Sequence, residues 1–94
     1  MDRVSEYIRA KNARLDEWEE DIARMKKEAG EEGVERRVRA QIDSLERRER
    51  AVRDMVESLR EVSDEEVKAV RSGVEQAWSQ LRESLQEASR TLSD

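Results

Sequence analysis

The chain has 94 residues, of which 46% are charged and 35% hydrophobic, and it contains no proline, cysteine, histidine or phenylalanine. This composition excludes disulfides, thiolate or imidazole metal ligands, and a catalytic centre based on histidine or cysteine. The net charge of −5 argues against a general nucleic-acid binder, which needs surplus Lys and Arg to neutralise phosphates.

So few large apolar residues cannot fill a broad core, but a coiled-coil seam needs only two or three apolar positions in seven. The apolar residues recur at helical spacing and the charges alternate in sign, which favours a folded helical protein over disorder. We expect residues 1–94 to form a single helical coiled-coil domain. No run is long enough to cross a membrane and no secretory signal begins the chain, so a cytoplasmic protein is expected.

The first predicted helix covers about residues 2–29, with Asp2 as its N-cap. Lys11 interrupts its apolar stripe at a position where an apolar residue is expected. The stripe consists of Val4, Ile8, Leu15, Trp18, Ile22, Met25 and Ala29. Gly30 and Gly33 follow, and they predict a turn into an antiparallel second helix, with Gly30 as a left-handed residue after the helix end.

The second predicted helix, residues 34–62, is the only one with a net positive charge. Glu49 lies where its seam expects an apolar residue, and we interpret it as a residue that sets the register by contacting Lys11 or an arginine. A turn at the glycines would bring the acidic residues of the first helix close to three arginines of the second. The acidic residues are Asp16, Glu17, Glu19, Glu20 and Asp21, and the arginines are Arg47, Arg48 and Arg50.

The boundary after the second helix allows two interpretations. Ser63 with Glu66 matches a capping box, and Val62 with Val67 occupies the hydrophobic-staple positions, which favours a tight turn. However, no glycine or proline ends the preceding helix. The apolar positions 45, 56, 67 and 78 are eleven residues apart, a spacing that one continuous helix could also carry.

The third predicted helix covers residues 64–92 and has the most regular apolar seam. Gly73 lies within it, in a strip of small residues that indicates either approach of a partner or, as we favour, close packing of a helix in the same molecule. Turns at both boundaries would place Trp18 and Trp78 in nearly the same layer. We expect these two side chains to pack in the core rather than to serve as binding anchors.

The second helix carries the best candidate for an anion site. The arginines of this candidate anion site are Arg36, Arg37, Arg39, Arg47, Arg48, Arg50 and Arg53. Enough acidic residues lie nearby that pairing within the molecule is the favoured interpretation. The carboxylates lack the inward Glu-x-x-His pattern of di-metal bundles. We therefore expect no catalytic residue, metal, cofactor, nucleic acid or small-molecule substrate.

Two short elements carry a resemblance. Leu-Asp-Glu-Trp at residues 15–18 and Gly-Val-Glu-Gln-Ala-Trp-Ser-Gln-Leu at residues 73–81, with Ile42, Leu45 and Leu59 between them, resemble a family of small hydrophilic bacterial coiled-coil proteins. Some members, including a cyanobacterial type, are described as stress-responsive. Similar proteins often carry a tryptophan early in the third helix, where this chain has Val67. The resemblance implies a bacterial cytoplasmic protein with a stress role and no catalytic residues.

The sequence therefore predicts an all-α fold, an antiparallel three-helix coiled-coil bundle. The alternative is a helical hairpin with a long C-terminal helix, completed by dimerisation. The expected function is that of a non-enzymatic structural or protein-interaction protein, with binding of anionic membrane surfaces as the alternative. The candidate interaction or core-seam residues are Trp18, Trp78, Gly73, Arg47 and Arg48.

Overall fold

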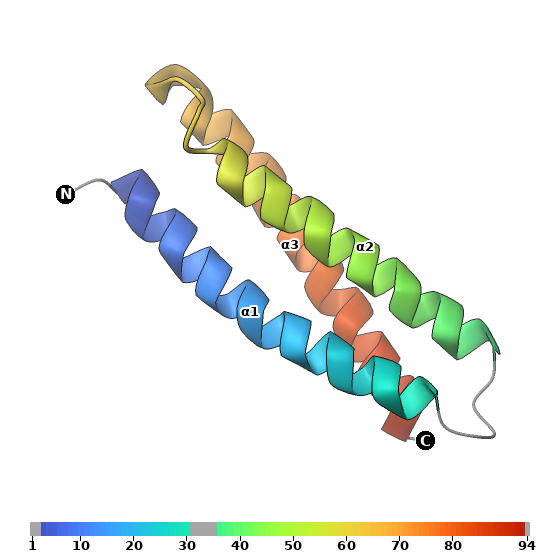
Figure 1. The fold of residues 1–94 in the computed structure, drawn as a ribbon. Helices are drawn as coiled ribbons and strands as arrows, with labels where there is room; N and C mark the ends of the chain where they lie inside the picture. Colours follow the sequence, from blue (N-terminus) through green and yellow to red (C-terminus); the bar gives the residue numbers. More distant parts are fainter. Residues whose placement is uncertain (1–2, 31–35, 94) are drawn as a thin grey trace.

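The computed structural model describes residues 3–30 and 36–93, and these form three helices. They are α1 (Arg3–Ala29), α2 (Arg36–Ser58) and α3 (Asp64–Ser93). Figure 1 shows α1 and α3 running in the same direction, with α2 antiparallel to both. The prediction of an all-α, antiparallel three-helix bundle is confirmed, and the chain turns between α2 and α3 as the favoured interpretation requires.

One continuous core runs along the long axis of the bundle, which measures 50 × 20 × 18 Å. All three helices contribute to it because each has apolar residues at steps of three and four. The buried apolar residues are Ile8, Leu15, Trp18, Ile22, Met25, Ala29, Val38, Ile42, Leu45, Val52, Val56, Leu59, Val74, Trp78, Leu81 and Ala88. None of the described helices is long and apolar enough to cross a membrane.

The end of α1 differs from the prediction at Gly30. Its amide donates to the carbonyls of Lys26 (3.1 Å) and Lys27 (3.2 Å), so the helical hydrogen bonding extends to this residue. Gly30 does not have a left-handed backbone, and the prediction that it does is wrong. The predicted N-cap Asp2, the start of the second helix at residue 34, and Gly33 lie outside the described residues.

The end of α2 also differs, because the helix ends at Ser58 rather than at residue 62. The amides of Leu59, Arg60 and Glu61 donate to the carbonyls three residues earlier, at 3.2, 3.0 and 3.0 Å. These tighter turns satisfy the last carbonyls of α2, so the helix can end without glycine or proline. The sequence does not reveal this ending because no residue type marks it.

The start of α3 is as predicted. The carbonyl of Ser63 accepts hydrogen bonds from the amides of Glu66 (2.9 Å) and Val67 (3.1 Å), which places Ser63 at the N-cap. Val62 and Val67, the predicted hydrophobic staple, are both partly buried and pack against the core. Three acidic residues in the first turn further favour the helix, since they lie at the positive end of its dipole.

Candidate interaction surfaces

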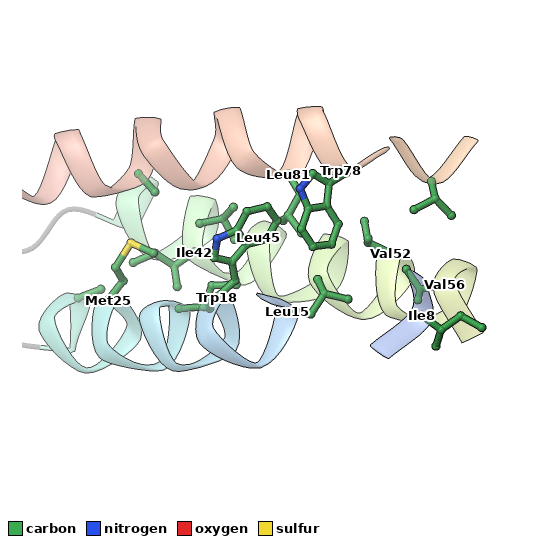
Figure 2. Packing of buried hydrophobic residues seen from close by; sticks show 14 of the residues in the cluster. Ile8, Leu15, Trp18, Met25, Ile42, Leu45, Val52, Val56, Trp78 and Leu81 are labelled. Atoms are coloured by element: carbon green, nitrogen blue, oxygen red, sulfur yellow. The ribbon is translucent and has the colours of Figure 1, made fainter. Parts of the chain in front are cut away.

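Trp18 of α1 and Trp78 of α3 meet inside the bundle, as Figure 2 shows. Their ring centroids are 4.5 Å apart, with 35° between the ring planes. The prediction that the two indoles share a layer is confirmed. Only 5% of Trp18 and 9% of Trp78 is exposed. Both residues therefore contribute to the core, where an aromatic pair adds roughly 0.5–1.5 kcal/mol beyond the area that it buries.

A polar cluster lies beside this pair and joins α1 to α3. We call it the Glu75 cluster; it consists of Tyr7, Lys11, Arg71 and Glu75, with the Arg71 guanidinium 4.5 Å from the centroid of the Tyr7 ring. The Tyr7 hydroxyl donates to Glu75 Oε1 (2.9 Å), and Lys11 Nζ donates to Glu75 Oε2 (3.3 Å). Lys11 Nζ also lies 3.9 Å from the ring centroid of Trp78, a cation–π contact. Lys11 can therefore replace an apolar residue in the stripe of α1, because its charge has both a carboxylate and an aromatic face as partners.

The Glu75 cluster shifts the pKa of two of its members in opposite directions. Burial and the hydrogen bond to Glu75 raise the pKa of Tyr7 to about 12, because both disfavour the phenolate. Burial alone would raise the pKa of Glu75. The hydrogen bonds from Tyr7 and Lys11 outweigh that effect, so the pKa of Glu75 lies below its ordinary value. The cluster thus favours a neutral Tyr7 and an ionised Glu75.

Alkaline titration should detect this cluster directly, because Tyr7 is the only tyrosine of the chain. We expect the phenolate absorbance of the folded protein to rise near pH 12, against about pH 10 in denaturant. Since the folded-state pKa is raised, the stabilisation that Tyr7 provides is complete below pH 10 and disappears as pH rises towards 12. Glu75→Gln should lower the midpoint. Equal midpoints in folded and denatured protein would contradict the hydrogen bond, with circular dichroism reporting that the chain stays folded.

A second polar cluster, the Arg53 cluster, joins α1 to α2. Arg53 Nη2 lies 2.8 Å from an oxygen of Glu49, 3.1 Å from Asp16 and 3.2 Å from Glu19. Glu49 is 4% exposed, the one buried charged residue among those described. Its predicted partner was Lys11 or an arginine, and the partner is Arg53. Burial alone would lower the pKa of Arg53, but the hydrogen bonds and charges of Glu49 and Asp16 outweigh it, so the pKa lies above its ordinary value.

The position of the Arg53 cluster corrects the predicted pairing of α1 with α2. The acidic residues of α1 were expected beside Arg47, Arg48 and Arg50, but two of them contact Arg53, further along α2. The prediction assumed that the second helix starts directly after the glycines. The contacts of Asp16 and Glu19 with Arg53 show that the two helices pair in a different register from the one expected.

The arginines of α2 do not form a single anion-binding patch. Arg53 points towards α1, whereas Arg48 donates to the Ser84 hydroxyl of α3 (2.7 Å). Arg47 is exposed and has no ion pair with the described residues. Helical spacing explains the separation, because arginines one or two positions apart on α2 lie on different faces. The two candidate interaction residues therefore lie in different surroundings: Arg47 faces solvent, whereas Arg48 contacts α3.

Gly73 packs within the molecule, on the side of α3 that faces α2. A Cβ atom built on Gly73 would lie 3.4 Å from the terminal methyl of Met55. Of its small neighbours at four-residue spacing, Ala77 is partly buried and Ala69 is exposed. Gly73 therefore packs against α2 within the same molecule, as the favoured interpretation expected, although an alanine would make only ordinary contact with Met55 at this position.

The bundle leaves a groove between the second halves of α1 and α3, with a volume of about 360 Å³. Its main lining residues are Asp21, Arg24, Met25, Glu28, Leu85 and Leu92. Leu85 and Leu92 are only partly buried, although both belong to the apolar seam of α3. Arg24 pairs with Asp21, whereas Glu28 is exposed and has no ion pair with the described residues. The groove therefore combines apolar side chains with a carboxylate that has no ion pair among the described residues.

The sequence did not predict the Glu75 cluster or this groove. Tyr7 and Lys11 are four residues apart, as are Arg71 and Glu75, so each pair lies on one helix face. That spacing gains meaning only once the tryptophan layer sets the register of α1 and α3. Among residues 3–30 and 36–93, no group of acidic residues is arranged to hold a metal ion.

Comparisons with protein families, curated proteins and solved structures found no match to this chain.

Proposed function

We propose that this chain is a non-enzymatic protein-interaction module of the cytoplasm that binds a helix of a partner protein in the groove between α1 and α3. The observation that supports this most is the partial exposure of Leu85 and Leu92, which belong to the seam of α3 but are left half-covered by the bundle. A fourth amphipathic helix lying in a groove between two helices is a common mode of protein recognition.

The charge of the groove suggests the chemistry of the partner. Glu28 lies exposed and unpaired among the described residues, and the chain as a whole has a net charge of −5. A partner helix with apolar residues for the groove and a lysine or arginine opposite Glu28 would match both features. Opposite charges at the edge of an interface mainly speed association and select the partner.

Site-specific photo-crosslinking in the source cells tests this proposal. A benzophenone side chain at position 28 lies in the groove, whereas the same group at the exposed position 76 lies on α3 outside it. We expect defined crosslinked proteins from position 28 only, and we expect Leu85→Gln to reduce them. Identical products from both positions, or none from position 28, would contradict the proposed site.

Binding to an anionic membrane surface is a second candidate function. The exposed residues Arg36, Arg37 and Arg47 favour it, because they have no ion pairs with described residues and lysines or arginines near anionic lipid contribute about 1 kcal/mol each. Flotation with vesicles that contain phosphatidylserine discriminates between the two functions. Co-flotation at low salt that is lost when the three arginines are replaced by glutamine would support membrane binding. The absence of co-flotation would exclude membrane binding as a function.

The resemblance to stress-responsive coiled-coil proteins adds a proposal about regulation. We propose that the amount of this protein rises under environmental stress. Transcript and protein levels after heat, osmotic and oxidative stress would measure this, and constant levels in all three conditions would contradict it.

A further inference from the structure

The junction between α2 and α3, residues 59–63, differs from an ordinary turn between helices. It contains neither glycine nor proline. The amides of Leu59, Arg60 and Glu61 stay hydrogen-bonded to carbonyls three residues earlier. A change from these bonds to the four-residue bonds of an α-helix needs only a small rotation per residue. Residues 59–61 can therefore become helical at little conformational cost, and the larger backbone change falls on Val62 and Ser63, which are not helical.

The apolar pattern continues across this junction. Leu45, Val56, Val67 and Trp78 follow one another at intervals of eleven residues, which is three helical turns with little drift. Leu45, Val56 and Trp78 are buried in the bundle, and Val67 is partly buried. One helix spanning residues 36–93 would keep these four residues on the same face. The apolar surface of α3 would then extend that of α2 in a straight line.

Among the described residues, α1 and α2 share more polar side-chain contacts with each other than either shares with α3. Besides the Arg53 cluster, Lys26 pairs with Glu46 (3.1 Å) and Asn12 donates to Glu57 (2.8 Å) between α1 and α2. The apolar seam of α3 is less completely buried than those of α1 and α2. Its partly buried apolar residues are Val67, Val70, Ala77, Leu85 and Leu92. The α1–α2 hairpin can thus stay together while α3 leaves it as one unit.

We propose that two copies of this chain exchange α3. The junction straightens in each copy, and each α3 docks on the α1–α2 hairpin of the other copy. The contacts of α3, including Trp78 with Trp18 and Glu75 with Lys11, are the same in the exchanged dimer as in the monomer, except that they join two chains. The balance between the two forms therefore depends on the junction and on protein concentration. The groove at Leu85 and Leu92 forms in both, so this proposal does not depend on the function proposed above.

Asp64 offers a substitution that separates the two junction geometries. It is the first residue of α3, where proline is well tolerated, and the preceding residue Ser63 occupies the N-cap, whose extended backbone suits a residue before proline. In a continuous helix the same proline would remove a hydrogen bond and clash with the previous turn. Asp64→Pro should therefore keep the monomer and prevent the dimer, and Asp64→Ala is the matched control.

A substitution at Ser63 should have the opposite effect and favour the dimer. Alanine favours a helix interior more than serine does, which should increase the population of the straight junction about twofold in each chain. Because the dimer contains two junctions, Ser63→Ala should raise the dimerisation constant roughly fourfold.

The experiment refolds each protein from denaturant at high concentration, dilutes it, and measures mass by light scattering after size exclusion. We expect a slowly dissociating dimer for the wild type and Asp64→Ala, more dimer for Ser63→Ala, and a folded monomer alone for Asp64→Pro. A continuous helix over residues 36–93 would make the dimer about 87 Å long, which X-ray scattering measures. As much dimer from Asp64→Pro as from Asp64→Ala, or no dimer from Ser63→Ala, would overturn the proposal.

Discussion

Trp78→Ala is expected to lower the free energy of unfolding by about 3–5 kcal/mol, the range for an aromatic residue removed from a core. The indole is 9% exposed, stacks on Trp18 at 4.5 Å between ring centroids, and lies under the Lys11 ammonium. Its removal opens a cavity at the middle of the bundle and leaves Lys11 without its aromatic contact. Since small domains are stable by only about 5–15 kcal/mol in total, the variant should be largely unfolded at moderate denaturant.

Urea unfolding followed by circular dichroism measures this loss, and Gln76→Ala on the exposed face of α3 is the matched control. A change within about 0.5 kcal/mol is expected for the control. A loss below about 1 kcal/mol for Trp78→Ala would show that the tryptophan pair does not form the centre of the core.

Arg53→Met is expected to cost about 2–4 kcal/mol, somewhat less than loss of a fully buried partner because 29% of the Arg53 side chain is exposed. The substitution leaves the buried carboxylate of Glu49 without its cation, close to Asp16 and Glu19. The opposite substitution, Glu49→Met, is expected to be neutral or stabilising, since it removes a buried charge while Arg53 retains two acidic partners.

This asymmetry is measured by the same urea unfolding, with Arg50→Met as the control. Within residues 3–30 and 36–93, Arg50 pairs only with Glu46 on its own helix, and 69% of its side chain is exposed, so its replacement should change stability by less than about 0.5 kcal/mol. If Glu49→Met were the more destabilising of the pair, the ion pair itself would stabilise the fold, and our account of Glu49 would be wrong.

The sequence was sufficient to predict the elements of the fold that follow from periodicity. Apolar steps of three and four predicted three helices, and the two turns predicted the shared layer of Trp18 and Trp78. Ser63 also indicated the start of α3 correctly, because an N-cap depends on local residue types. These features depend on local sequence or on spacing along one helix.

Features that depend on the register between helices were predicted less well. The acidic residues Asp16 and Glu19 of α1 meet Arg53 rather than Arg47, Arg48 and Arg50, because the spacing of residues along each helix does not fix the register between two helices. Similarly, Gly30 stays within helical hydrogen bonding, and α2 ends at Ser58 without a marker residue. The Glu75 cluster requires four side chains from two helices to meet, which no pattern within one helix specifies.

The central claim is that one chain alone completes the bundle by turning at residues 59–63. Small-angle X-ray scattering with light scattering, on natively purified protein at low concentration, tests it most directly. We predict a mass of 11.0 kDa and a radius of gyration close to 15.2 Å, the value for the Cα atoms, with hydration adding slightly. A particle of twice this mass with a longest dimension near 87 Å, as the sole species at low concentration, would contradict the claim, since no chain would then complete the bundle alone.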